Sequence, residues 1–116
     1  MPLADGTADV YVHQNAYHQH FSADLSAEQV ALDAATQRPF NTAALTEGSG
    51  EPAWRTTPSW FIYPELDLAI PAQAFRFMAE RAGARATVEV PGASHALPAS
   101  QPQAVADFIL QAAAAD

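Results

Sequence analysis

The feature that most constrains the fold is a pair of strand-like segments separated by one helix, in the second half of the chain. Residues 59–63 (Ser-Trp-Phe-Ile-Tyr) form an apolar run that ends at Pro64, typical of a strand covered on both faces. Residues 87–90 alternate polar and apolar side chains, which predicts a second strand. A strand, a crossover helix and a strand favour a right-handed parallel unit. Two strands are too few for a complete parallel sheet, so the sequence looks like part of a larger α/β fold.

Two amphipathic helices are predicted, one between the strands and one after them. The first begins at Pro71, where a missing N–H costs nothing, and ends at Gly83. Ser100 and Gln103 form a capping-box pattern that predicts the start of the second helix. Apolar residues recur at i, i+3, i+4 and i+7 in both helices, at Phe75, Met78, Ala79 and Ala82 and at Val105, Phe108, Ile109 and Ala112. The predicted fold class is therefore α/β, with the order β-α-β-α and parallel strands.

The first 47 residues give weaker signals. Residues 10–12 (Val-Tyr-Val) predict a short strand. A capping box at Ser26 and Gln29 predicts a helix that stops before Pro39, because proline restricts the residue that precedes it. This helix carries few large side chains, so we expect a lid or a packing accessory. Residues 48–52 (Gly-Ser-Gly-Glu-Pro) predict a linker.

Composition limits both the core and the range of partners. Of the 116 residues 49% are hydrophobic, but 27 residues are alanine, so a core of larger side chains is thin. Thirteen acidic residues against 5 arginines and no lysine give a net charge of -8, which excludes a basic surface for nucleic acid or anionic lipid. The absence of cysteine excludes disulfides and a cysteine nucleophile. No membrane-spanning run or signal peptide is visible, so a cytoplasmic location is expected.

Two loops that follow the predicted strands carry the side chains best suited to catalysis. The loop after the first strand contains Glu65 and Asp67, and the loop after the second contains Ser94 and His95. In open α/β sheets, reactive side chains gather at the carboxyl ends of the strands. An aspartate that accepts the Nδ1–H of a histidine fixes its tautomer and leaves Nε2 free as a general base. Adjacent strands would bring Asp67 and His95 within hydrogen-bond reach.

Each of these residues also has a purely structural interpretation. From spacing alone, Asp67 is more often a carboxylate that caps the helix near Pro71. His95 is as readily a loop histidine without a role. Glu65 is a second candidate acid or simply a solvated carboxylate, and Ser94 is expected to shape its loop.

Two further groups of side chains carry weaker hypotheses. His13, His18 and His20, with Asp24 nearby, resemble a loose metal-ligand set, but no local geometry supports one, and no metal or cofactor is predicted. Aromatic residues could line a pocket, although strand residues of this type are more often core; they are Trp54, Trp60, Phe61 and Tyr63.

From about residue 21 to its end, the chain resembles the C-terminal portion of the α/β-hydrolase fold family, particularly small esterase-like members with a helical cap. The resemblance covers about the last two fifths of a usual family member. It is carried by PSWFIY at 58–63, Asp67 followed by IP at 70–71, FMAERAGA at 77–84 and GASH at 92–95. Two upstream pieces, FSADL at 21–25 and PAWRT at 52–56, are similar to the cap region and to the lead into the penultimate strand.

The resemblance implies that Asp67 is the acid and His95 the base of a catalytic triad. The family's nucleophile lies on a Gly-x-Ser-x-Gly elbow that precedes the cap, and this sequence contains no such pentapeptide. The Gly-Ser-Gly at 48–50 lacks the spacing and the preceding strand. The family's oxyanion-hole loop is also absent, and Pro64 stands where the family often has glycine.

The expected organisation is a cap or lid remnant with a linker at 1–50, and the C-terminal part of an α/β-hydrolase core at 51–116. The leading hypothesis is a member of a family that hydrolyses small ester-like substrates, retaining the triad acid and base but inactive alone. One alternative is a half-enzyme completed by an N-terminal half or by self-association through open strand edges. Others are a non-catalytic small α/β interaction module and a metal protein built on His18 and His20.

Overall fold

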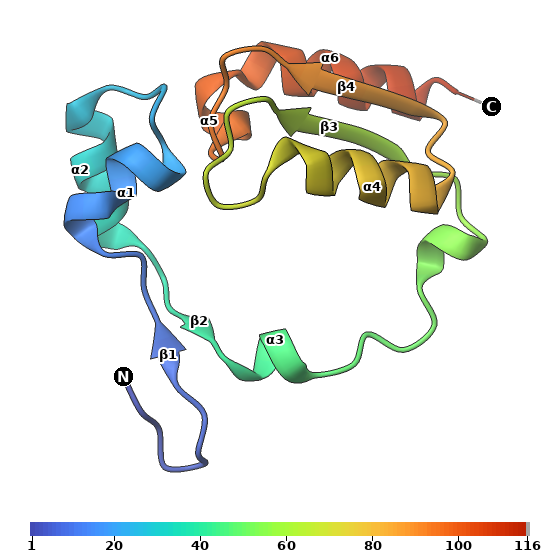
Figure 1. Cartoon of the computed structure of the whole chain (residues 1–116). Helices are drawn as coiled ribbons and strands as arrows, with labels where there is room; N and C mark the ends of the chain where they lie inside the picture. The colour runs from blue at the N-terminus through green and yellow to red at the C-terminus, as the bar shows by residue number, and fades with distance from the viewer. Residues whose placement is uncertain (116) are drawn as a thin grey trace.

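A computed structural model describes residues 1–115. The second half of the chain is a parallel β-α-β unit followed by two helices (Figure 1). Its elements are β3 (Trp60–Pro64), α4 (Ala72–Ala82), β4 (Ala86–Val90), α5 (Leu97–Ser100) and α6 (Pro102–Ala113). The predicted α/β class and the order of these elements are confirmed.

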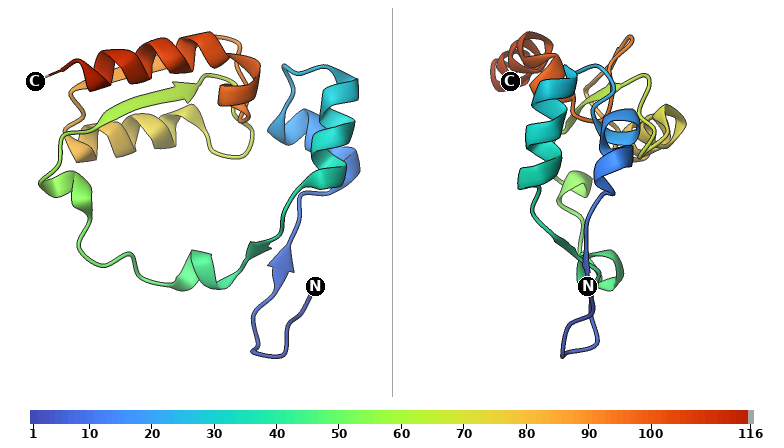
Figure 2. Two further views of the ribbon diagram at one scale, coloured as in Figure 1. Left: turned by 180° about the vertical axis from the view of Figure 1, so that it is seen from behind. Right: turned by 90° about the vertical axis from the view of Figure 1, so that its left-hand side faces the viewer.

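Strands β3 and β4 pair in parallel, from Trp60 opposite Ala86 to Pro64 opposite Val90. Helices α4 and α6 lie on opposite faces of this strand pair, as the two views in Figure 2 show. The register places the carboxyl ends of both strands at one edge, because Pro64 and Val90 are paired. The loops that follow the strands therefore start side by side.

Helix α4 forms as its sequence pattern predicts. Its apolar face is buried or half-buried, and the Phe75 ring stacks on Tyr63 of β3 with centroids 5.3 Å apart. The helix ends at Gly83, which has a φ of 61°. Glycine suits this left-handed C-terminal position because it has no Cβ to clash with the backbone.

The start of α6 differs from the prediction. The helix begins at Pro102, and the Ser100 hydroxyl is buried without a hydrogen-bond partner, so the capping box does not form. The separate turn α5 ends at Ser100, which leaves Gln101 as the boundary residue and gives proline the first helical position. Ile109 is also 59% exposed rather than part of the buried face.

The first half of the chain contains a pair of packed helices. They are α1 (Gln14–Phe21) and α2 (Ala27–Thr36), and a small core of Tyr17, Val30 and Ala34 lies between them. The Ser26 side chain caps α2 as predicted, but Gln29 bonds Asp33 instead of reaching back. Helix α1 was not predicted, because its polar sequence QNAYHQHF has only a narrow apolar stripe.

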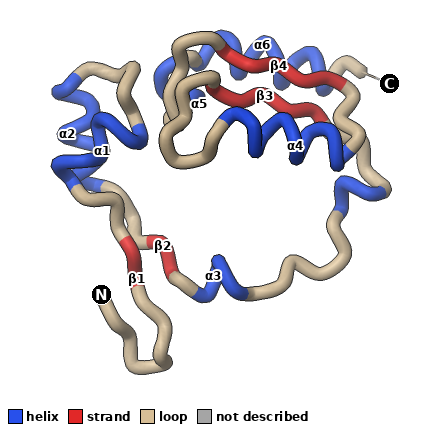
Figure 3. The backbone as a smooth tube through the Cα atoms, viewed as in Figure 1, coloured by secondary structure: helices blue, strands red, loops and turns tan. Residues whose placement is uncertain are grey.

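An extended segment joins the helix pair to the β-α-β unit. It contains β2 (Phe40–Asn41), paired antiparallel with β1 (Asp9–Val10), then the short helix α3 (Ala43–Thr46) and the 3₁₀ turn η1 (Ala53–Arg55). The tube in Figure 3 shows this segment as an arch of mostly loop.

The radius of gyration of the chain is 16.3 Å, which exceeds the about 13 Å expected of a compact domain of this length. No described helix is both long and apolar enough to cross a bilayer.

Across residues 1–115, β3 and β4 pair only with each other, so each strand keeps one unpaired edge. Trp60, Phe61 and Ile62 are only half-buried on this strand pair, whereas Tyr63 is buried. The expectation of a strand covered on both faces is thus met at its carboxyl end alone. Exposed edges of this kind are sites for pairing with further strands.

We expect the isolated chain to unfold without a single cooperative transition. Its two buried clusters are separate, one around Tyr17 in the helix pair and one around Val90 beside β4. Both tryptophans belong to the second half, so their fluorescence should follow that half alone. Urea unfolding by fluorescence and by far-ultraviolet circular dichroism should give different midpoints. Coincident curves would contradict this expectation.

Candidate active site

The two loops beyond the strands are tied together by hydrogen bonds. The backbone N–H groups of Glu65 and Leu66 donate to the carbonyls of Val90 and Ala93, both at 3.0 Å. The Glu65 carboxylate accepts the N–H of Gly92 at 2.8 Å. Glu65 therefore braces the histidine loop, a role that sequence reasoning missed because the contact joins two loops 27 residues apart.

Asp67 is buried where the two loops meet. Its side chain is 1% exposed, and its Oδ1 atom accepts the N–H groups of Ala69 and Ile70, both at 2.8 Å. Its Oδ2 atom lies 2.8 Å from Nδ1 of His95. The carboxylate thus shapes its own turn and meets the histidine. It does not cap α4, whose boundary residue is Pro71.

His95 uses one ring nitrogen for this contact and leaves the other available. With the proton on Nδ1, the ring donates to Asp67, and Nε2 is then an acceptor. The His95 side chain is 26% exposed, so a substrate or another side chain can approach the ring from solvent. Its ring packs against Phe21 of α1 with centroids 4.3 Å apart. The structure brings together the two residues singled out as a candidate acid and base.

The end of α1 and the turn that follows it contact the residues on either side of His95. The Ser94 hydroxyl donates a hydrogen bond to the Asp24 carboxylate, and the N–H of Ala96 donates to the Phe21 carbonyl at 2.9 Å. Burial by itself raises the pKa of Asp24, but the contacts of its carboxylate with Ser94, with the Ser100 side chain and with its own backbone together outweigh burial and lower that pKa. The carboxylate is therefore held in its charged form.

The histidines near the N-terminus do not converge. Residues 1–115 contain no group of three His, Cys, Asp or Glu side chains that could hold a metal ion. Nε2 of His18 lies 3.1 Å from the Leu25 carbonyl, so this ring joins α1 to the turn that follows. Asp24, grouped with these histidines from its spacing, instead bonds Ser94.

The aromatic residues fill structural positions. The guanidinium groups of Arg55 and Arg81 lie 5.7 and 5.4 Å from the ring centroid of Trp54. Burial raises the pKa of the Tyr63 hydroxyl, and its bond to Glu89 raises it further. Arg76 of α4 also bonds Glu89 in bidentate fashion, at 2.7 to 2.9 Å, and so ties that helix to β4.

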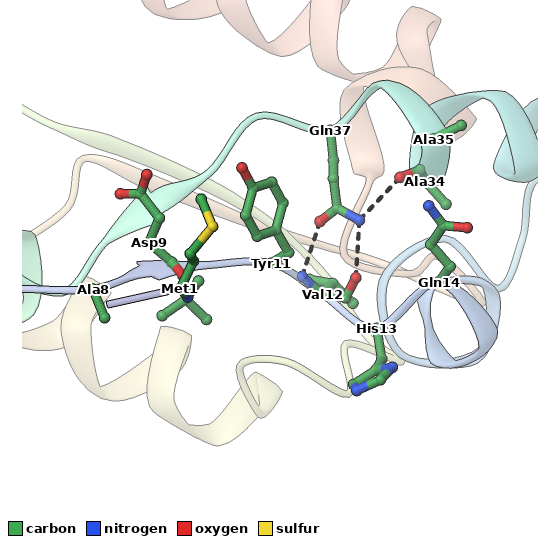
Figure 4. A pocket seen from close by; sticks show the side chains of 11 residues that line it. Met1, Ala8, Asp9, Tyr11, Val12, His13, Gln14, Ala34, Ala35 and Gln37 are labelled. Carbon is green, nitrogen blue, oxygen red and sulfur yellow. Dashed lines mark hydrogen bonds between the residues drawn. The ribbon is translucent and has the colours of Figure 1, made fainter. Parts of the chain in front are cut away.

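Two of the hollows in the first half of the chain lie near β1 and the helix pair. One, of about 550 Å³, lies beside β1 and α2. Figure 4 shows the Gln37 side chain in it, bridging Val12 and Ala34 by hydrogen bonds. The other, of about 480 Å³, is mostly apolar and reaches Phe21, the residue that packs on His95. Its lining residues are Val10, Tyr11, Val12, Tyr17, Phe21, Gln37, Arg38 and Phe40.

A parallel strand pair that presents an aspartate and a histidine at its carboxyl edge, beside a pair of packed helices, is the layout of the C-terminal part of an α/β-hydrolase fold. A model of the alpha/beta hydrolase family matches residues 2–108, so the chain belongs to this family. The match begins well before residue 21, where the sequence resemblance starts. The first strand and α1 are therefore family elements too.

Solved structures with a similar fold include polyneuridine aldehyde esterase, with a TM-score of 0.76 and 17% sequence identity. That comparison covers 96% of this chain and 51% of the esterase. A mutant of the same enzyme gives a TM-score of 0.77 at 16% identity, over 91% of this chain and 47% of that one. The chain thus spans about half the length of these structures. No curated protein matches the sequence.

Replacing Glu65 with alanine should destabilise the loop pair by about 1 kcal/mol, because the Gly92 N–H loses its acceptor. Glu65→Gln is the matched control, since its side-chain oxygen still accepts the bond. Urea unfolding followed by tryptophan fluorescence measures the difference. Equal stability of the two variants would show that the bond contributes nothing.

Proposed function

We propose that this chain supplies the acid and the base of an ester-hydrolysing site. The observation that carries the proposal is the 2.8 Å contact between Nδ1 of His95 and Oδ2 of the buried Asp67. Family membership supports it, because α/β-hydrolases place these two residue types after neighbouring strands. Residues 1–50 act as a cap and linker, and residues 51–116 form the C-terminal part of the catalytic core.

In the proposed reaction, Nε2 of His95 removes the proton from a serine hydroxyl as that oxygen attacks the ester carbonyl. Asp67 keeps the imidazole in the tautomer that leaves Nε2 free, and it stabilises the imidazolium that forms. Nε2 then returns the proton to the departing alkoxide. Water repeats the cycle on the acyl-enzyme and regenerates the serine.

The attacking serine comes from outside these 116 residues. The sequence has no Gly-x-Ser-x-Gly elbow. Among residues 1–115, the only side-chain hydrogen bond of His95 is to Asp67, and Ser94 bonds Asp24 instead. The hydroxyls of Ser22, Ser59 and Ser100 are buried. We therefore expect the chain alone to be inactive.

The substrate we propose is a small ester with an apolar group. The apolar hollow of about 480 Å³ reaches Phe21, whose ring also contacts His95. An apolar acyl or alkyl group there would lie close to the reacting centre. The guanidinium group of Arg38 in the same lining would favour an ester that also carries a hydrogen-bond acceptor.

The missing machinery would be supplied by a further polypeptide segment. The free edges of β3 and β4 favour this completion over an independent interaction module, because unpaired parallel strands leave backbone groups without partners. The segment would carry the elbow serine and the oxyanion donors. It could belong to the same polypeptide or to another.

The test joins the chain, by fusion or by mixing, to the nucleophile-bearing half of an α/β-hydrolase and follows hydrolysis of a p-nitrophenyl ester. We expect activity from the two parts together and none from either alone. Replacing the elbow serine with alanine is the control for background hydrolysis. Hydrolysis by the 116-residue chain alone would contradict the proposal, and so would a folded complex that shows no activity.

A further inference from the structure

Three successive residues of the histidine loop are each contacted by the end of α1 or by the turn that follows it. Ser94 donates its hydroxyl hydrogen bond to Asp24, the His95 ring packs on Phe21, and the Ala96 N–H donates to the Phe21 carbonyl. Asp24 and Ser94 are 70 residues apart in sequence. The cap therefore holds the candidate base on both flanks.

From these contacts we propose that Asp24 is a positioning residue for His95, acting through the hydroxyl of Ser94. The proposal deepens the proposed function and rests on it, because positioning matters only if His95 is the base. Asp24 does not touch the imidazole, so it takes no part in proton transfer. It fixes the backbone immediately before His95.

The chemistry of the Ser94 contact makes it suited to this task. Ser94 is 4% exposed, so leaving its hydroxyl without a hydrogen-bond partner would destabilise the fold. A hydrogen bond from a hydroxyl to a charged carboxylate is about twice as strong as one between neutral groups. Its partner comes from the turn between α1 and α2.

Without Asp24, the first half of the chain would hold the loop only through Phe21, and the other contacts come from the strand side. Glu65 holds the Gly92 N–H, and Asp67 holds the His95 ring. Gly92 has a φ of 69°, so the loop leaves β4 through a residue with unusual backbone freedom. A second anchor on Ser94 limits the movement of His95 away from Asp67. A shift of the cap would then be transmitted to the base.

The test observes the imidazole directly in the full 116-residue chain. Nuclear magnetic resonance of ¹⁵N-labelled protein follows the His95 Nδ1 proton and its exchange with water. Asp24→Ala and Ser94→Ala should each speed this exchange by about tenfold, the effect of losing one charge-assisted hydrogen bond. The double variant should be no faster than either single variant, because both remove the same bond.

Two controls separate positioning from a general loss of structure. Glu28→Gln removes an exposed charge from α2, in the same cap, and should leave the exchange unchanged. Backbone amides of β3 and β4 should keep their protection in every variant. If Asp24→Ala does not fold, Asp24→Asn keeps the side-chain shape with a weaker acceptor and should give a smaller change in the same direction.

The outcomes distinguish the two proposals. If the wild-type chain shows no Nδ1 proton that depends on Asp67, the proposed function fails, and the positioning role fails with it. If that proton is present but exchanges equally fast in the wild type, Asp24→Ala and Ser94→Ala, only the positioning role is overturned. An additive double variant would also overturn it.

Discussion

Replacing Asp67 with alanine is expected to destabilise the chain by about 2 to 3 kcal/mol, because one buried carboxylate holds three donors. The N–H groups of Ala69 and Ile70 would lose their acceptor, and the His95 ring would lose its anchor. This loss is large beside the roughly 5 to 15 kcal/mol typical of a whole domain. Urea unfolding followed by tryptophan fluorescence measures it.

Asp67→Asn separates the two tasks of this side chain. Its remaining oxygen can still accept from the turn amides, whereas its NH₂ group would face the Nδ1–H of His95. We therefore expect most of the stability to return while the ring loses its preferred tautomer. If the alanine variant were as stable as the wild type, the contacts of Asp67 would be incidental.

Replacing His95 with alanine should abolish hydrolysis by the chain joined to a nucleophile-bearing half, with a loss of roughly 10⁴-fold or more. The reason is that no other described residue bonds Asp67 at Oδ2 and offers a free ring nitrogen. Initial rates of p-nitrophenyl ester hydrolysis measure the loss.

The matched control for His95→Ala is His20→Ala, since His20 is an exposed histidine of α1. It should leave the rate unchanged. Unfolding curves of both variants show whether the fold survives. A His95→Ala enzyme that keeps more than a few per cent of its activity would require another base.

The β-α-β unit could be predicted from sequence because each of its signals is local. The apolar run at residues 59–63, Pro71 and Gly83 each act through their own backbone, and the structure places the elements where these signals fall. Helix α1 escaped prediction because tertiary packing of Tyr17 and Phe21 stabilises it more than its own sequence does. The capping box at Ser100 failed since Pro102 competes for the same helix start.

In the candidate site too, some contacts could be predicted from sequence and others could not. The pairing of Asp67 with His95 could be predicted from sequence because each residue follows one of two adjacent parallel strands. The strand register then aligns the carboxyl ends of β3 and β4, so the two loops start side by side. The contacts of Asp24 and Glu65 could not be foreseen, because they join loops far apart in the chain. Asp24 sat near three histidines in sequence, which suggested a metal set instead.

The most direct test of the central claim is the intact mass of the chain after exposure to a fluorophosphonate, with circular dichroism confirming that the sample is folded. The account predicts no adduct on the 116 residues alone, and one adduct on the elbow serine once a nucleophile-bearing half is joined. A single adduct on this chain alone that disappears in His95→Ala would contradict it, because one of these serines would then be the nucleophile.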